Sequence, residues 1–440
     1  MIVLEFKIKG KQHQLERIDE AIRTGQFIRN KCLRFWMDNQ KINRYDLNKH
    51  CAVLAHEFKF ADNLNSMARQ SHAERAWIAI SRFYANCRSG APGKKGYPNF
   101  KHNSQSVEYK TSGWKLGESR RYINFKDGQE IGRLKLIGTR DLNFYPIEQI
   151  KRVRLIRRAD GYYCQFCISI DVVEDVTPTQ SAVGLDVGLN FFYTDSTGRQ
   201  EENPRFYRQA EKRLKRLQRR VSKKLKKPKK NRVLPGEASL ARFGGQKILP
   251  ADSRHRQTLE GDKQSNNYKK AKQKLAKKHL KVSRQRIEHA KRLARCVVKS
   301  NDFVAYEDLQ IRNMVKTHCL AKSITDAGWY QFRLWLEYFG QKFGKATVAV
   351  SPHYTSQECS SCGIAVKKSL STRTHICKCG CVLDRDENAA LNILKKGLST
   401  VGHTGTWALS PNAGGDETST QVGVNLLGQV LSLNQESPCL

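Results

Sequence analysis

One carboxylate interrupts an otherwise apolar stretch at residues 181–189, where Asp186 stands among small and branched apolar side chains. The pattern predicts a buried strand with this acid in its middle, followed by a second strand at 191–194. Burying an ionised carboxylate is costly unless it is paired or bound to a metal. Gly184 and Gly188 leave room for a metal ion or for backbone to approach closely. The fold must therefore bring a compensating group to Asp186.

Two more acids stand in comparable surroundings. Glu307 lies at the end of an apolar strand within 303–309, and Asp386 lies in the acidic first turn of a helix predicted at 384–394,. Each acid alone could be a cap, a surface charge or half of a salt bridge. Together with Asp186 they could converge at one end of a sheet. Three carboxylates without a histidine suit Mg2+, and two such ions about 4 Å apart support phosphodiester hydrolysis.

A cluster of cysteines predicts a structural zinc site. Cys359 and Cys362 form a C-x2-C-G knuckle, and Cys377 and Cys379 follow at a spacing typical of a second knuckle,. The second half offers C-x-C where C-x2-C is usual, so Cys381 competes with Cys379 as the fourth ligand. The alternative is a set of unrelated buried thiols. Four thiolates leave no open position on zinc, so the predicted role is structural.

The charge balance indicates a polyanionic partner. Lysine and arginine number 79 against 41 acids, a formal net charge of +38. Self-repulsion of this size destabilises a compact chain unless a polyanion offsets it, and nucleic acid is the obvious candidate. The alternative is a solvated basic surface that keeps the protein soluble.

Much of this charge lies in two segments, 205–230 and 265–300, which are predicted to be long helices separated by a loop at 231–264,. Antiparallel pairing would bury an apolar seam on the second segment and leave basic outer faces. The residues expected to contact phosphates are Arg213, Lys215, Arg216, Arg219, Arg220, Lys277, Lys278, Arg284 and Arg286.

The amino-terminal part reads as helices at 14–39 and 62–88, followed by a β-rich region at 104–175,. Within that region, 153–156 and 162–172 predict a hairpin with a turn at Asp160-Gly161,. No signal peptide or membrane span is apparent, which predicts a cytoplasmic protein. Its thirteen cysteines are then expected to be thiols or metal ligands,. Cys164 and Cys167 lie inside a predicted strand, where residues three apart point to opposite faces, so we interpret them as buried cysteines.

Four stretches of the chain resemble the TnpB family, the transposon-encoded nucleases of bacterial insertion sequences that are related to type V CRISPR effectors. They occur in the family's order, with the basic helices between the first two and the cysteine cluster beginning in the third and ending before the fourth. The amino-terminal stretch 95–101 is also similar to the family. The four stretches are residues 184–188, 306–309, 352–363 and 384–390.

This resemblance implies an RNA-guided DNA endonuclease with a RuvC-like, RNase H-like domain. Its implied catalytic residues are Asp186, Glu307 and Asp386, holding two Mg2+ ions, and Asp386 is preferred to Asp384 because it stands two residues before the Asn of Asn-Ala-Ala. The implied partners are a guide RNA from the transposon end, double-stranded target DNA with an adjacent motif, and a transposase of the same element, with no membrane.

The resemblance also implies a domain plan. It comprises a wedge-like β-barrel at 1–15 and 91–175, a helical recognition lobe at 16–90, a RuvC-like domain at 180–354 and 382–398, zinc knuckles at 355–381 and a flexible tail at 399–440.

Three other functions are compatible with parts of the pattern. A compact type V CRISPR effector would share every motif. A guide-independent nuclease or transposase would use the same acids, although the large basic amino-terminal half disfavours it. A nuclease-dead, RNA-guided DNA-binding regulator is disfavoured because all three acids are present.

Overall fold

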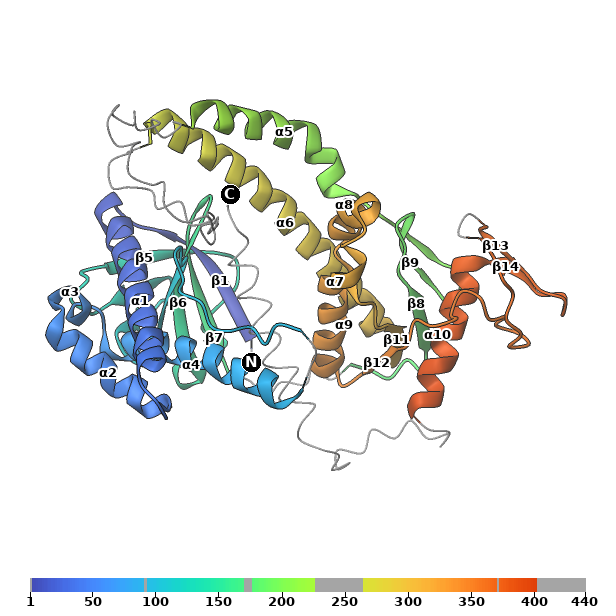
Figure 1. The fold of residues 1–440 in the computed structure, drawn as a ribbon, viewed down its shortest axis with the longest axis horizontal. Helices are drawn as coiled ribbons and strands as arrows, with labels where there is room; N and C mark the ends of the chain where they lie inside the picture. The colour runs from blue at the N-terminus through green and yellow to red at the C-terminus, as the bar shows by residue number, and fades with distance from the viewer. Residues whose placement is uncertain (1, 91–92, 170–175, 226–263, 370–371, 402–440) are drawn as a thin grey trace, which may run out of the picture.

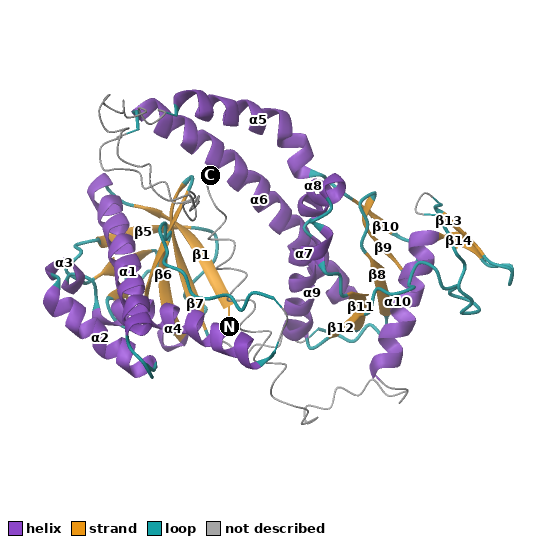
Figure 2. Cartoon of the chain, viewed as in Figure 1, coloured by secondary structure: helices purple, strands orange, loops and turns teal. Residues whose placement is uncertain are grey.

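The computed structural model describes residues 2–90, 93–169, 176–225, 264–369 and 372–401. Two lobes are evident in Figure 1, each with its own sheet and helices, and two long helices run from the second lobe toward the first. Both lobes mix helices with strands (Figure 2), so the predicted combination of α/β and β-rich parts is confirmed at this level. Within the described residues, no helix is both long and apolar enough to cross a membrane.

The amino-terminal lobe contains a seven-stranded sheet whose neighbouring strands are all antiparallel, in the order β2-β6-β7-β1-β5-β4-β3. The predicted hairpin is confirmed, because the sixth and seventh strands pair directly and residues 159 and 160 form the turn between them. The strands are β1 (Ile2–Lys9), β2 (Ser106–Tyr109), β3 (Trp114–Leu116), β4 (Tyr122–Phe125), β5 (Gly132–Ile137), β6 (Ile150–Arg158) and β7 (Gly161–Ile168).

Four helices pack beside this sheet: α1 (Gln12–Asp38), α2 (Arg44–Glu57), α3 (Lys59–Asp62) and α4 (Ser66–Arg88). Helix α2 was not expected from the sequence, although its start carries a clear signal. The side chain of Asn43 accepts hydrogen bonds from the backbone of the first turn, and the carboxylate of Asp46 accepts one from the backbone N–H of Asn43,. Helices and sheet share one continuous core. Cys164 and Cys167 are both buried in β7, as expected.

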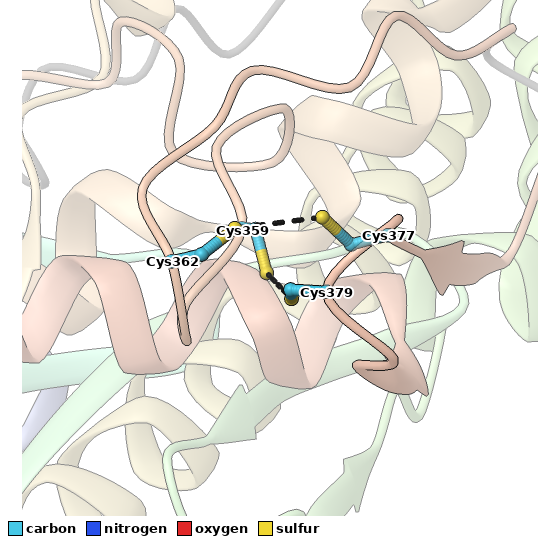
Figure 3. Close-up of side chains that lie close together, drawn as sticks. All are labelled: Cys359, Cys362, Cys377 and Cys379. Atoms are coloured by element: carbon cyan, nitrogen blue, oxygen red, sulfur yellow. Dashed lines mark hydrogen bonds between the residues drawn. The ribbon is translucent and has the colours of Figure 1, made fainter.

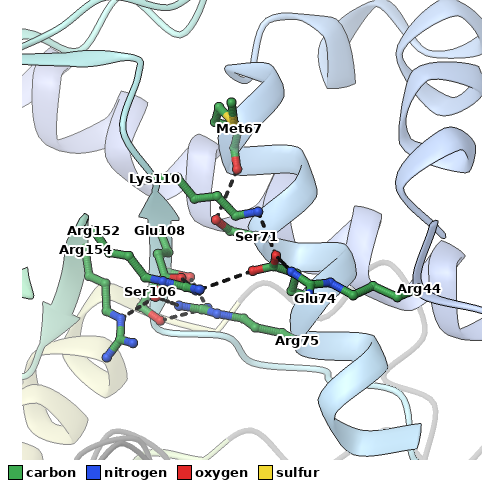
Figure 4. A network of polar contacts seen from close by, with 10 residues as sticks. All are labelled: Arg44, Met67, Ser71, Glu74, Arg75, Ser106, Glu108, Lys110, Arg152 and Arg154. Carbon is green, nitrogen blue, oxygen red and sulfur yellow. Dashed lines mark hydrogen bonds and ion pairs between the residues drawn. The ribbon is translucent and has the colours of Figure 1, made fainter. Parts of the chain in front are cut away.

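A buried ion network joins helices α2 and α4 to the sheet (Figure 4). Glu108 on β2 is 1% exposed and contacts Arg75, Arg152 and Arg154. Arg152 also reaches Glu74 on α4, at 3.4 Å. Burial opposes ionisation of Glu108, but the three guanidinium groups hold the pKa of its carboxyl well below the usual range. This carboxylate therefore compensates several cations that would otherwise repel one another inside the lobe.

Replacing Glu108 with glutamine should lower the free energy of unfolding by about 3 kcal/mol, because it leaves buried guanidinium groups uncompensated. Chemical denaturation followed by circular dichroism measures the change. Glu118→Gln is the matched control, since Glu118 is exposed and the described part of the chain offers it no ion pair. Equal stability of the two variants would contradict the assigned role of the network.

The second lobe is built on a five-stranded sheet in the order β10-β9-β8-β11-β12. Three of its strands form an antiparallel meander, and the other two extend the sheet in parallel with the first strand of that meander. The strands are β8 (Ala182–Asp186), β9 (Phe191–Asp195), β10 (Gln200–Glu202), β11 (Phe303–Glu307) and β12 (Ala346–Val350).

Helices cover both faces of this sheet. Helices α6 (Asn266–Ser300) and α9 (Trp329–Phe343) pack on one face, and α10 (Arg385–Val401) packs on the other. The lobe also contains α5 (Phe206–Lys224), α7 (Ile311–Met314) and α8 (His318–Ala327). Alternate residues of β11 face opposite sides. Val304 and Tyr306 pack in the core with α6 and α9, whereas Phe303 and Ala305 pack with Ile393 of α10,. Both faces are apolar because both are covered.

The two basic segments form the predicted helical pair. Leu214 and Val221 of α5 pack against Leu275 and Val282 of α6, which confirms that the apolar seam is buried. The predicted loop lies almost wholly within residues 226–263, outside the described residues. Helix α10 extends to Val401, so the tail prediction is corrected at 399–401, which are helical; its remainder, 402–440, lies outside the described residues.

Candidate functional site

Two of the three predicted carboxylates lie at the same edge of the five-stranded sheet. Asp186 is the last residue of β8, not in the middle of a strand as the sequence suggested, and Glu307 is the last residue of β11. The two strands are parallel neighbours, with Leu185 opposite Tyr306. Asp186 and Glu307 directly follow these two residues, so the two acids lie side by side at the ends of adjacent strands.

Helix α10 brings the third carboxylate. It packs so tightly on β8 that a Cβ at Gly184 would lie 2.1 Å from the carbonyl oxygen of Ala390. Strand alternation places Gly184 and Asp186 on this same face. The first turn of α10 carries Asp386. Asp384 has a different role. Its Oδ1 accepts a hydrogen bond from the backbone N–H of Asp386 at 2.8 Å and so caps the helix,.

The electrostatics show that the three acids interact. Burial, followed by the charges of Glu307 and Asp386, raises the pKa of Asp186 well above its usual value. Burial also raises the pKa of Glu307, although a hydrogen bond from Thr355 opposes the shift. Three half-buried carboxylates that repel one another offer only oxygen donors, a set that suits a hard divalent cation. The donor chemistry therefore fits Mg2+.

Cations and a hydroxyl surround these acids. Arg385 lies 3.2 Å from Asp386, and Arg373 lies 3.5 Å from its other carboxylate oxygen. The hydroxyl of Thr355 donates to Oε1 of Glu307 at 2.6 Å. Sequence reasoning did not single out Thr355, because its partner lies 48 positions away along the chain.

The four predicted cysteine ligands come together (Figure 3). Their sulfur atoms all lie within 4.8 Å of one another, with Cys359 at 3.7 Å from Cys379 and Cys362 at 3.5 Å from Cys377. A tetrahedral zinc with Zn–S bonds of about 2.3 Å needs sulfur separations of about 3.8 Å. The arrangement therefore fits a four-thiolate zinc site.

Backbone geometry separates Cys379 from its competitor Cys381. The N–H of Cys362 points at the sulfur of Cys359 and lowers the pKa of that thiol to about 5. The sulfur of Cys362 accepts the N–H of Ile364, two residues later, and the sulfur of Cys379 accepts the N–H of Cys381 in the same way. Cys379 thus holds the position in the second knuckle that Cys362 holds in the first, and Cys381 takes part through its backbone N–H.

Two asparagines of α10, missed by the sequence analysis, join this region to the helix. The amide of Asn388 donates to the carbonyl of Glu358 at 2.8 Å, and its oxygen accepts the N–H of Ser360 at 2.9 Å. Asn392 donates to the carbonyls of Thr355 and Glu358, at 2.9 and 2.7 Å. A buried amide was detectable in principle from its place on the inner face of a predicted helix.

The predicted phosphate-contacting residues divide into two groups. Arg213, Arg216, Arg219 and Arg220 are exposed on α5, and Lys215 is exposed while pairing with Glu211. On α6, Arg284 pairs with Asp160 of the amino-terminal lobe at 2.6 Å, and Arg286 donates to the carbonyl of Thr325. Lys277 and Lys278 lie on the same helix, the first exposed and the second half-buried. Contact of all nine with nucleic acid stays a prediction.

Comparison with known proteins finds similar families and relatives. The family model described as "Probable transposase" matches residues 165–235 and 251–318, and the model described as "Cas12f1-like, TNB domain" matches 329–393. A Streptomyces pristinaespiralis protein named "Putative RNA-guided DNA endonuclease" is 28% identical over 410 residues, which cover 90% of this chain and 89% of that protein. The "TnpB-like protein L79" of Acanthamoeba polyphaga mimivirus is 30% identical over 141 residues, covering 30% and 27%.

The chain is thus similar to TnpB-like proteins and to proteins named as RNA-guided DNA endonucleases. A chain from the cryo-EM structure of the Cas12f1–sgRNA–target DNA complex aligns over 87% of this chain and 83% of its own length, with a TM-score of 0.49 and 15% identity. The match to the TNB domain model spans the four clustered cysteines and the first turns of α10.

One zinc ion per chain is expected from the cysteine geometry. Cys379→Ser should lose most of the zinc and destabilise the region around it, because binding of a structural metal contributes to folding. Cys381→Ser, the matched control, should keep its zinc because only its backbone takes part. Elemental analysis of the purified proteins measures both, and loss of zinc from the Cys381 variant alone would reverse the ligand assignment.

Proposed function

We propose that this chain is an RNA-guided DNA endonuclease of an insertion sequence that hydrolyses phosphodiester bonds of target DNA at a RuvC-like site. The convergence of Asp186, Glu307 and Asp386 from β8, β11 and α10 carries the proposal. The names of the curated relatives support the reaction class and its dependence on a guide.

The topology supports a RuvC-like, RNase H-like assignment for the lobe. An antiparallel meander is followed by parallel strands on one side, and two of the acids end the adjacent parallel strands β8 and β11. The domain plan predicted from the resemblance stands as part of this proposal, including a wedge-like barrel formed by the amino-terminal sheet. The hydrogen-bond ladder of that sheet runs from β2 to β3 without a described pairing between these two edge strands.

The chemistry assigned to the chain rests on its carboxylates. Asp186, Glu307 and Asp386 would hold Mg2+, which when bound lowers the pKa of water and stabilises the leaving oxygen. The protein's own part is to fix three oxygen donors at one sheet edge. Thr355 orients one of them, and Arg373 and Arg385 lie beside another. The four clustered cysteines would hold a structural Zn2+,.

The proposed partners follow from charge and from the relatives. A net charge of +38 and the exposed arginines of α5 suit the backbone of nucleic acid,. The proposed ligands are a guide RNA from the transposon end and double-stranded DNA with an adjacent motif; a transposase of the same element is the proposed protein partner. Copurifying RNA would separate this proposal from a guide-independent nuclease.

Asp186→Ala should abolish DNA cleavage and leave RNA and DNA binding within a few-fold, because it removes a metal ligand from the edge of the sheet. Single-turnover cleavage of labelled target DNA by the guide-loaded protein measures the effect. Cleavage at the wild-type rate in this variant would overturn the assignment.

Asp386→Asn and Asp384→Asn form a matched pair, since asparagine at 384 keeps the capping oxygen while removing the charge,. Only Asp386→Asn should lose cleavage, in the same single-turnover assay. Loss in the Asp384 variant alone would transfer the catalytic role to Asp384.

Changing Arg213, Arg216, Arg219 and Arg220 together to glutamine should weaken nucleic-acid binding about equally for all sequences. Phosphate contacts position the ligand without reading its bases. The dependence of binding on salt should also become shallower, by roughly 0.9 in logarithmic slope for each duplex phosphate that the variant no longer neutralises. Binding isotherms across a salt series measure both, and the four-lysine variant is the charge-conserving control. If affinity and salt dependence were both unchanged, the basic face would serve only to keep the protein soluble.

A further inference from the structure

Thr355 connects the cysteine-bearing part of the chain to the proposed catalytic carboxylates. We call residues 353–381 the cysteine segment; residues 370 and 371 within it are not described. Thr355 is 4% exposed, and its hydroxyl lies 2.6 Å from Oε1 of Glu307. The same hydroxyl lies 3.2 Å from the carbonyl oxygen of Pro352. A group of the cysteine segment therefore touches a carboxylate that ends β11.

Helix α10 holds the backbone of Thr355 in place. Asn392 is 6% exposed and donates to the carbonyl of Thr355 at 2.9 Å and to that of Glu358 at 2.7 Å. Asn388 is fully buried and binds Glu358 and Ser360 from one helical turn earlier. These bonds join the cysteine segment to the helix whose first turn carries Asp386.

The backbone before Thr355 adopts a conformation that needs such support. Tyr354 has a φ of 62°, a left-handed conformation that is costly for a bulky side chain,. Its carbonyl oxygen accepts the N–H groups of Gln357 and Glu358, at 3.0 and 2.9 Å. The turn that presents the Thr355 hydroxyl to Glu307 is thus over-determined by local hydrogen bonds and by the asparagines of α10.

We propose that Thr355 is a positioning residue for catalysis, through which the cysteine segment fixes the orientation of Glu307. The proposal rests on the function proposed above. A hydroxyl that donates to Oε1 restrains the rotation of the carboxylate and leaves the other oxygen to bind a cation. Groups that orient metal ligands in this way typically affect metal affinity or activity by about 10- to 100-fold when removed.

The decisive comparison is Thr355→Val, which keeps the side-chain volume, against Thr355→Ser, which keeps the hydroxyl. Thr374→Val is the matched control, because Thr374 is an exposed residue of the same segment, on β13 (Thr374–Ile376). Each guide-loaded protein is assayed for single-turnover cleavage across a Mg2+ series, for binding of target DNA and for zinc content. Thr355→Val should lower the cleavage rate about 10- to 100-fold and raise the Mg2+ concentration needed for half-maximal rate. Zinc content and target binding should stay at wild-type levels.

A second readout does not depend on cleavage. Mn2+ bound by the protein without nucleic acid is measured by electron paramagnetic resonance, and the amount bound by Asp186→Ala is subtracted as background. Thr355→Val should bind Mn2+ about 10-fold more weakly than wild type. Thr355→Ser and Thr374→Val should resemble wild type in both assays.

The outcomes separate this proposal from the one on which it rests. If the wild-type protein cuts DNA and Thr355→Val shows undiminished cleavage and Mn2+ binding, only the role of Thr355 is overturned. Equal impairment of the valine and serine variants would also overturn it, because the hydroxyl would then be irrelevant. If the guide-loaded wild-type protein leaves the DNA uncut, the proposed function is overturned, and the role of Thr355 is overturned with it.

Discussion

The close contact between α10 and β8 at Gly184 is the constraint on which the second lobe depends. A methyl group there would lie 2.1 Å from a backbone carbonyl oxygen, so only glycine permits the observed helix–strand distance. This distance brings Asp386 to the sheet edge where Asp186 and Glu307 end their strands. The repulsion among the three acids, evident in the raised pKa of Asp186, is tolerated because the surrounding packing holds them together.

The same helix also organises the cysteine segment, which the chain inserts between β12 and α10. Asn388 and Asn392 bind three backbone groups of that segment from the inner face of the helix, two to six positions after Asp386. One rigid helix, α10, therefore aligns two chemically different clusters, the oxygen donors of the acids and the thiols of the cysteines. The sheet supplies the remaining two acids, and α10 fixes the position of the cysteine segment relative to them.

The sequence predicted those features that depend on local patterns. Alternation and spacing indicated the β6–β7 hairpin, the α5–α6 pair and the three acids in apolar surroundings. Asp186 was misplaced within its strand because the apolar pattern continues to Leu189, whereas pairing ends at the acid. Helix α2 was overlooked despite the capping box at Asn43. Thr355 and Asn392 could not be assigned from pattern, because their partners lie 48 and 37 positions away and are chosen by the tertiary fold.

Helix α6 has a mechanical consequence. It is 35 residues long, which corresponds to about 50 Å,. Its carboxyl-terminal half is anchored in the core beneath the acids, while Arg284, midway along it, rests against Asp160 and the ring of Tyr163 in the other lobe. A rigid rod held at one end acts as a lever, so a tilt of about 5° at the buried end displaces the far tip by about 4 Å. A small adjustment in the core would thus be magnified toward the exposed arginines of α5, which packs along α6.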